Sequence, residues 1–258
     1  MQPSIELAGL IRHYLFLDLT QVNRRLRLFP DGSTGIVLNS ALSWDSQSLP
    51  AAFFYGQITA YKELLSTGPA NMAIIVLHPH ALNLLLDIPA SQLNDQAVAL
   101  DTLFGEAAAT LQLAIATAET PTKKVGIIEN FFRAIASHRE PLTDPLVSKA
   151  LQIIRQTHGA ISVLQLAAHL GCHARQLERK FSTSVGLSPK QYCTIIRTLH
   201  FVKSLQTNET HAPLTGATYD SGYYDQAHGI RAFRKATGLT PSTYLKQADP
   251  LALNFLVL

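Results

Sequence analysis

The sequence predicts an α+β N-terminal domain followed by an all-α domain with two helix-turn-helix motifs. Three observations predict this fold class. The net charge changes sign along the chain, the second part contains an internal repeat with helix-ending residues, and the first part begins with β-prone segments. We place the α+β domain at residues 1–140, a linker at 141–147, the all-α domain at 148–247 and an apolar tail at 248–258.

The composition excludes several classes of protein. Of the 258 residues, 47% are hydrophobic and 15% are charged, so the chain can bury a sizeable core and is not intrinsically disordered. The longest nearly uncharged stretch, residues 67–86, is interrupted by prolines, histidines and asparagines and does not predict a membrane span. Two cysteines, Cys172 and Cys193, are too few for a disulfide framework or a thiolate zinc site. No signal-peptide pattern opens the chain, so we expect a cytoplasmic protein with reduced thiols and no cofactor.

The two parts of the chain differ in charge. Residues 1–144 contain nine Lys or Arg and thirteen Asp or Glu residues, a net charge of −4. Residues 145–258 contain twelve and five, a net charge of +7. A basic part beside an acidic one suggests a polyanionic partner for the basic part.

The basic part contains two copies of the pattern F-x4-G-L-[ST]-P-x-x-Y, at residues 181–192 and 233–244. All its defined positions recur at an offset of 52 residues, which Arg179 and Arg231 share. This agreement indicates that one helical unit is duplicated.

Each copy predicts a helix, a tight turn and a second helix. Gly186 and Gly238 are expected just past the first helix, where the left-handed backbone conformation favours glycine. An apolar residue, a capping Ser or Thr and a proline at the first helical position follow, at residues 187–189 and 239–241. In the first copy Gln191 completes a capping box.

A further helix and turn precede the first copy. Ser162 and Gln165 form a capping box that opens a helix over residues 163–170, and Gly171 closes it. A second helix over about residues 174–185 follows after a short turn, which is the geometry of a helix-turn-helix. The outer face of this helix carries Arg175, Glu178, Arg179 and Ser182. A single polar helix face of this kind usually contacts only solvent. Here the turn, the basic charge and the duplication favour a binding role.

These residues resemble the DNA-binding domain of AraC/XylS-family transcriptional regulators over about residues 145–247. In the first copy the resemblance rests on Leu166, Ala167, Gly171, residues 175–181, residues 186–189 and Arg197; in the second it rests on residues 222–228, Arg231, Phe233, residues 238–241 and Tyr244. The string YYDQAH…R.F…TGLTP is specific to one branch of the family. Residues 1–140 loosely resemble the N-terminal domain of that branch, through FPDGSTGIVLN with its PDG motif at residues 29–39 and YGQ from Tyr55.

The resemblance implies two recognition helices in the major groove of double-stranded DNA, joined by a rigid helix. The implied base-reading residues are Arg175, Gln176, Glu178 and Arg179 in the first helix and Gln226, Ala227, His228 and Arg231 in the second. Arg can pair with guanine, Gln with adenine and Glu with cytosine, while Ala can touch a thymine methyl group. The residues interpreted as phosphate contacts are Lys180, Lys190, Arg234 and Lys235.

The second motif departs from the family pattern. Ala217 and Thr218 replace the usual Ile-Ala pair before the turn, Ser221 replaces an apolar residue, and Gly229 replaces a large apolar residue inside the recognition helix. A glycine inside a helix costs about 1 kcal/mol relative to alanine. In the first motif His173 stands where the family usually has a Ser or Thr cap. We therefore predict looser packing in the second motif.

The N-terminal part is less informative. Strands are expected at residues 5–19, 53–57 and 72–77, and helices at 101–117 and 122–137. The resemblance implies a sensor or dimerisation domain, with three candidate partners besides DNA: a small-molecule effector in this domain, RNA polymerase and a second copy of the chain. His78 and His80 would share one face of a continued strand, but no third metal ligand accompanies them, so we expect no metal site.

We expect a sequence-specific transcription regulator whose N-terminal domain modulates DNA binding in response to a signal. It is not expected to be an enzyme, because nucleotide loops, nucleophile elbows and paired catalytic carboxylates are absent from the sequence. One alternative is a binding or adaptor protein whose degenerate second motif has lost DNA specificity. A repair enzyme of the DNA-methyl-acceptor type would need a cysteine cluster in the N-terminal domain, and residues 1–171 contain no cysteine.

Overall fold

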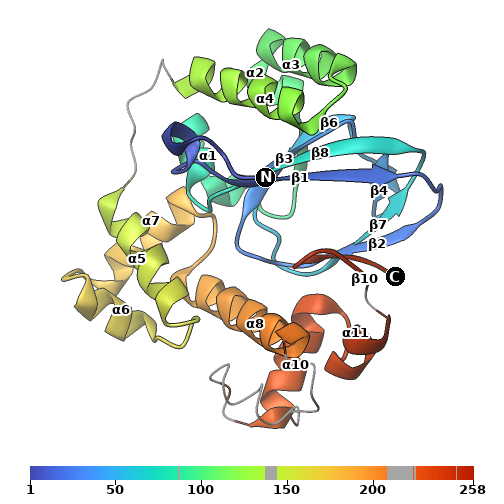
Figure 1. The fold of residues 1–258 in the computed structure, drawn as a ribbon. Helices are drawn as coiled ribbons and strands as arrows, with labels where there is room; N and C mark the ends of the chain where they lie inside the picture. The colour runs from blue at the N-terminus through green and yellow to red at the C-terminus, as the bar shows by residue number, and fades with distance from the viewer. Residues whose placement is uncertain (87, 137–143, 208–222, 224, 248) are drawn as a thin grey trace.

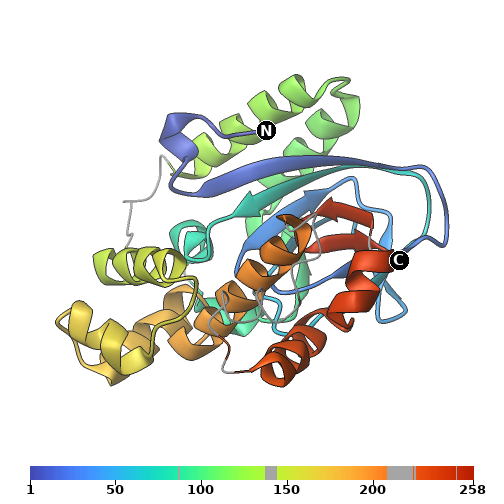
Figure 2. The same cartoon turned by 60° about the horizontal axis from the view of Figure 1, so that its bottom comes forward.

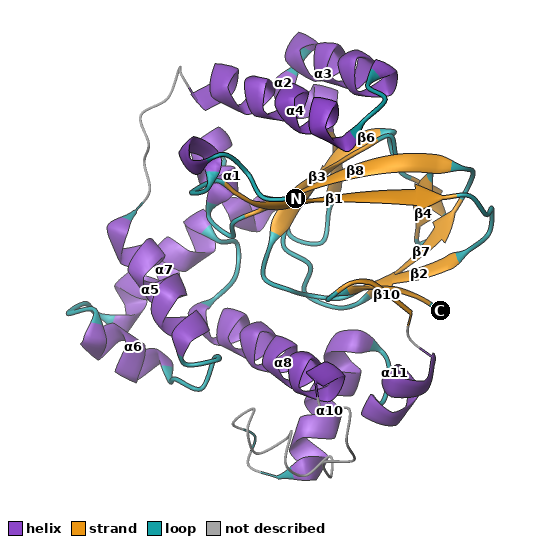
Figure 3. Cartoon of the chain, in the orientation of Figure 1, coloured by secondary structure: helices purple, strands orange, loops and turns teal. Residues whose placement is uncertain are grey.

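The fold combines an N-terminal β-sandwich with two groups of helices (Figure 1). The computed structural model describes residues 1–258 except 87, 137–143, 208–222, 224 and 248. One helical group lies on the outer side of the sandwich, and the C-terminal helices lie on its other side, as Figure 3 shows by element type.

The sandwich consists of two antiparallel sheets. The first has the order β1-β8-β3-β6-β9, with β1 (Ile11–Leu19), β8 (Ala70–Leu77), β3 (Thr34–Leu38), β6 (Ala52–Tyr55) and β9 (Ala97–Ala99). The second has the order β10-β11-β2-β7-β4-β5, with β10 (Asp249–Ala252), β11 (Phe255–Val257), β2 (Arg25–Leu28), β7 (Lys62–Ser66), β4 (Leu42–Trp44) and β5 (Gln47–Ser48). Their facing apolar side chains form one core, and Trp44 belongs to it.

The last residues of the chain complete the second sheet. Residues 248–258 were expected to be an apolar tail that packs on the body, but β10 and β11 form a hairpin, and β11 pairs with β2. Figure 2 shows this hairpin against the sandwich, directly after the C-terminal helices. The N-terminal sandwich is therefore built from both ends of the chain.

The outer helical group covers the first sheet. It comprises η1 (Ile5–Leu7), α1 (Ala81–Leu85), η2 (Ala90–Leu93), α2 (Leu100–Phe104), α3 (Glu106–Thr117) and α4 (Pro121–Ala136). The expected strand over residues 5–19 was too long, because residues 5–7 form a 3-10 turn that packs on α4, where Ser4 N donates to Glu129 Oε1 at 2.7 Å. The expected single helix over 101–117 was also wrong. Gly105, with φ +54° and ψ −134°, breaks it into α2 and α3.

The C-terminal helices are α5 (Pro145–Gln156), α6 (Val163–His169), α7 (Ala174–Ser184), α8 (Pro189–Thr207), α10 (Gln226–Thr237) and α11 (Pro241–Gln247). Helix α5 overlaps the predicted linker, because Asp144 caps it through Leu146 N at 3.0 Å and residues 145–147 are helical. Residues 141–143 lie outside the described part of the chain. Cys172 and Cys193 are free thiols, and burial raises the pKa of Cys193 to about 11. Among the described helices, none combines the length and apolar character that a membrane crossing requires.

Candidate nucleic-acid interface

The first helix-turn-helix is formed by α6 and α7. The predicted capping box is confirmed, since Gln165 N donates to Ser162 Oγ at 3.2 Å and Ser162 N donates to Gln165 Oε1 at 3.0 Å. Gly171 takes a left-handed conformation with φ +62°, as predicted for the residue that ends α6. His173 precedes α7 without a capping side-chain hydrogen bond. The two helices pack through a shared core of Leu166, Ala167, Leu177 and Phe181.

The outer face of α7 is free for a partner. Its inner side chains are fully buried, and this fixes the opposite face toward solvent. The predicted base-reading residues of this helix are all exposed: Arg175, Gln176, Glu178 and Arg179. The first recognition face therefore combines two guanidinium groups, one amide and one carboxylate on adjacent turns.

Helix α10 of the second motif presents a comparable face. Asp225 caps it by accepting a hydrogen bond from His228 N at 2.6 Å. Ala227, His228 and Arg231 are exposed, and Gln226 is half-buried. The ring of His228 lies edge-on to Tyr223, with 5.4 Å between centroids.

An aromatic cluster packs the described part of the second motif. Phe233 lies 5.4 Å from Phe201 and 5.6 Å from Tyr244, and Phe201 lies 6.0 Å from Tyr223, all between ring centroids. Gly229 is buried in this motif. The other departures, at Ala217, Thr218 and Ser221, lie outside the described residues, so looser packing there stays a prediction.

The predicted phosphate contacts fall into two groups. Lys190, Arg234 and Lys235 are exposed. Lys180 instead forms an ion pair with Asp144, the cap of α5. Partial burial works against ionisation of this carboxyl, but hydrogen bonds from Lys180 and Leu146 N outweigh it and lower the pKa of Asp144. Lys180 thus ties α5 to α7.

A basic hollow lies between α8 and α10. It has a volume of about 500 Å³, and its lining includes Lys190 from α8 and His228, Arg231 and Lys235 from α10. Pro30 and Thr59 of the sandwich border it. The cationic groups of α8 and α10 thus face a common space, which suits a polyanion.

The N-terminal domain contacts the ends of α7 and α10. After α7, Asn94 Nδ2 donates to Gly186 O at 2.6 Å. At the end of α10, Arg27 Nη1 donates to Thr237 O at 3.3 Å. Gly186 and Gly238 have φ values of +88° and +73°, as the repeat predicts. Sequence analysis missed both interdomain contacts, because no local pattern marks a pairing between residues this far apart in the chain.

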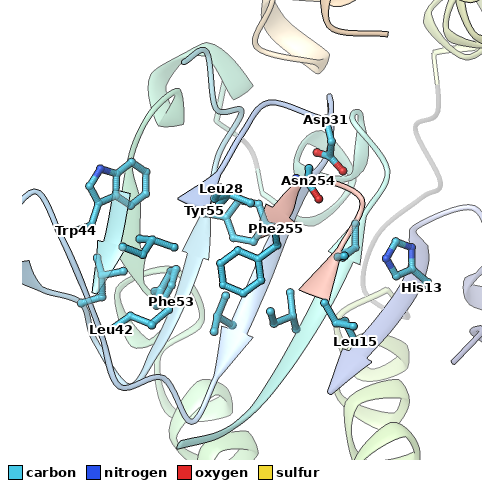
Figure 4. A pocket seen from close by; sticks show the side chains of 16 residues that line it. His13, Leu15, Leu28, Asp31, Leu42, Trp44, Phe53, Tyr55, Asn254 and Phe255 are labelled. Atoms are coloured by element: carbon cyan, nitrogen blue, oxygen red, sulfur yellow. The ribbon is translucent and has the colours of Figure 1, made fainter. Parts of the chain in front are cut away.

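A second cavity lies inside the sandwich. It has a free volume of about 60 Å³ and is lined mainly by apolar side chains of both sheets. Figure 4 shows Trp44 and Leu42 at one end and the polar groups of Asp31 and Asn254 toward the other. Asp31 lies 3.5 Å from Arg12 Nη1 and accepts from Ser33 N at 2.9 Å. Burial and the adjacent Arg12 lower the pKa of His13, which lines the same cavity.

His78 and His80 do not share a strand face. Strand β8 ends at Leu77, and His80 precedes α1. His78 Nε2 lies 3.0 Å from Ala8 O, and the two imidazole rings are 5.9 Å apart. Burial, together with His78 and Arg155, lowers the pKa of His80 to about 4. In the described part of the chain, no group of three or more His, Cys, Asp or Glu residues could hold a metal ion.

Comparisons with known proteins agree with this architecture. Residues 166–247 match a family described as a helix-turn-helix domain, and residues 1–99 match a domain of unknown function, DUF6597. A Streptomyces antibioticus protein named "Putative AraC-like transcription regulator" is 28% identical over 118 residues, which is 45% of this chain and 38% of that protein. The chain thus matches well under half the length of this relative.

Two crystal structures of ToxT from Vibrio cholerae O395 have a similar fold. One has a TM-score of 0.50 and 12% identity, covering 93% of this chain and 98% of ToxT. The other, bound to (E)-4-(8-methylnaphthalen-1-yl)but-3-enoic acid, has a TM-score of 0.51 and 12% identity, covering 91% and 98%. Fold and site thus define a two-domain helix-turn-helix protein. Its C-terminal helices match the helix-turn-helix domain family over residues 166–247, and part of the chain is similar to an AraC-like transcription regulator.

Proposed function

We propose that the chain is a sequence-specific regulator of transcription that binds double-stranded DNA through α7 and α10. The observation that carries this proposal is the pair of exposed, arginine-bearing faces on α7 and α10, with the 19-residue helix α8 between these two helices in the chain. At 1.5 Å per residue, α8 is a rod of about 28 Å. Successive major grooves on one face of DNA lie about 34 Å apart, so a rod of this length suits two neighbouring grooves.

Within this proposal the exposed side chains have two roles. The side chains along the outer faces of α7 and α10 read base edges in the major groove: Arg175, Gln176, Glu178, Arg179, Gln226, Ala227, His228 and Arg231. Lys190, Arg234 and Lys235 hold phosphates, and Lys180 can join them if it leaves Asp144. Contacts with RNA polymerase and between two copies of the chain, and a cytoplasmic location, remain expectations from the family.

The test is selection of bound sequences from random DNA by the full-length protein. We expect two short base clusters about one helical turn apart, bound with an affinity that falls steeply as salt rises, because phosphate contacts release counterions. Inserting about half a turn between the clusters should reduce the affinity to that of one cluster. Recovery of no preferred sequence would support the adaptor alternative, which the buried glycine at Gly229 favours.

The sandwich cavity supports a second part of the proposal, that the N-terminal domain responds to a small, mainly apolar ligand. Ligand sites are typically apolar with a few convergent polar groups, and this cavity has apolar walls with Asp31 and Asn254 at one end. The ToxT ligand has an aromatic apolar part and a carboxylic acid, so this compound is a suitable first probe. A rise in unfolding temperature with probe concentration would support the site.

A further inference from the structure

The hairpin β10–β11 lies between the sandwich cavity and the all-α domain. Along β11 the side chains alternate: Phe255 and Val257 belong to the core between the sheets, whereas Leu256 is fully buried in the core of the all-α domain. The neighbouring segment does the same, with Leu28 on the sandwich side and Phe29 in the all-α core. Two adjacent strands therefore each present one face to each domain.

Hydrogen bonds join these two segments near the residues where consecutive side chains enter different cores. Phe29 N donates to Asn254 O, and Asn254 Nδ2 donates to Phe29 O, both at 3.0 Å. Leu28, Asn254 and Phe255 also line the cavity (Figure 4). Any movement of this cavity wall consequently reaches Phe29 and Leu256, which are one or two residues away.

The same sheet contacts the second recognition helix. Arg27, paired with Leu256 in the β2–β11 register, donates to Thr237 O at the end of α10. Its guanidinium lies 4.7 Å from the centroid of Tyr61 and forms an ion pair with Glu63. A Cβ atom at Gly238 would come within 2.8 Å of both Arg27 and Tyr61, so the end of α10 is packed tightly on this sheet.

A ligand larger than the free space of the cavity, about 60 Å³, needs one wall to yield. The hairpin is the end of its sheet and pairs with β2 over three residues, whereas β8 and β3 have longer partners on both sides. The hairpin is thus a wall with fewer backbone restraints than β8 or β3.

We propose that the hairpin β10–β11 couples the cavity to the second helix-turn-helix: a small apolar ligand that expands the cavity displaces the hairpin, withdraws Leu256 and Phe29 from the all-α core, and releases α10 from the sandwich. This inference rests on the proposed DNA-binding function and adds the direction in which the ligand changes DNA affinity. A released α10 still packs on α8 through Phe201 and Phe233 but loses the sandwich contact that fixes its end. Occupancy therefore lowers affinity for a two-cluster site and leaves affinity for a single cluster unchanged.

Neighbouring residues of β11 provide the first test. Leu256→Ala removes a side chain from the all-α core, and Val257→Ala removes one from the sandwich core on the same strand. In the full-length protein, amide exchange across α10 and α11 should rise about tenfold or more in Leu256→Ala. In Val257→Ala it should stay as in the parent protein. Equal exchange in the two variants would overturn the coupling. Leu256→Met keeps the volume of the side chain, so amide exchange in this variant should stay as slow as in the parent protein.

The second test fills the cavity from the facing sheet. Ile74 of β8 lines the cavity, and Ile74→Phe enlarges this side chain, whereas Ile74→Leu keeps its volume. Ile74→Phe should speed exchange in β11, α10 and α11 together and weaken two-cluster binding about tenfold or more. Faster exchange in β11 with unchanged α10 and α11 would contradict the coupling. Because amide exchange needs no DNA, failure of the parent protein to bind DNA would count against the proposed function and leave this test intact.

Discussion

Removing different exposed cationic side chains of this protein should change DNA binding in different ways. Arg175 lies on the outer face of α7, whereas Lys190 lies at the start of α8 beside the basic hollow. Arg175→Ala should cost about 1–3 kcal/mol at particular base pairs and relax specificity there. Lys190→Ala should weaken binding evenly across sequences and reduce the salt dependence. Binding measured against a panel of single-base variants decides this, and equal shifts for all sequences in both variants would show that the recognition face is assigned wrongly.

A buried histidine should make stability depend on pH. The pKa of His80 is about 4 in the folded protein, against an ordinary value of 6.5 in the unfolded chain. Between these values the unfolded chain binds more protons, so this group stabilises the fold fully above pH 6.5 and its contribution is lost as pH falls toward 4. The loss should be about 3 kcal/mol. His80→Leu should remove it, as measured by denaturant unfolding of both proteins at neutral and acid pH. If His80→Leu changes the unfolding free energy equally at both pH values, this assignment is wrong.

At the scale of elements, signals close together in sequence were predicted well. Capping boxes and helix-ending glycines place both ends of α6 and α7 within one residue, and the prolines at first helical positions place the starts of α8 and α11, because each signal acts on its own helix. The hairpin at the chain end was missed, because its pairing partner β2 lies more than two hundred residues away. The alternation of Phe255, Leu256 and Val257 makes sense only once both cores are known.

The break between α2 and α3 gives a matched test of backbone conformation. Gly105 has φ +54° and ψ −134°, which side-chain-bearing residues rarely adopt, and a Cβ there would meet nothing within 4 Å. Gly105→Ala should therefore destabilise the protein by about 1–3 kcal/mol through the backbone alone. Gly126, inside α4, also has open space around it. Gly126→Ala should stabilise by about 0.5–1 kcal/mol. Thermal unfolding measures both, and effects of the same sign would refute the conformational explanation.

At the scale of the whole molecule, the two domains share their packing. The sequence division at residues 140–148 follows charge and pattern, but Phe29 and Leu256 place side chains of the sandwich in the all-α core. The charge asymmetry therefore places the exposed basic residues in the C-terminal part. It does not predict this shared packing of the two domains, called the interlock below, because the packing depends on long-range contacts. Because the core of the all-α domain includes Phe29, we expect a fragment of residues 145–258 to be less stable than the full chain.

This interlock predicts that both domains unfold together. Trp44, the single tryptophan of the sequence, lies in the sandwich core and reports on that domain, whereas far-ultraviolet circular dichroism reports mainly on the helices. In the parent protein the two signals should follow one transition.

Phe29→Ala should lower the unfolding free energy by about 3–5 kcal/mol. It should also separate the transitions, because it removes the all-α core's contact and leaves the sandwich core intact. Val257→Ala is the control, since it weakens only the sandwich core and should keep the signals coincident. Two separate transitions in the parent protein would show that Phe29 and Leu256 do not bind the domains together.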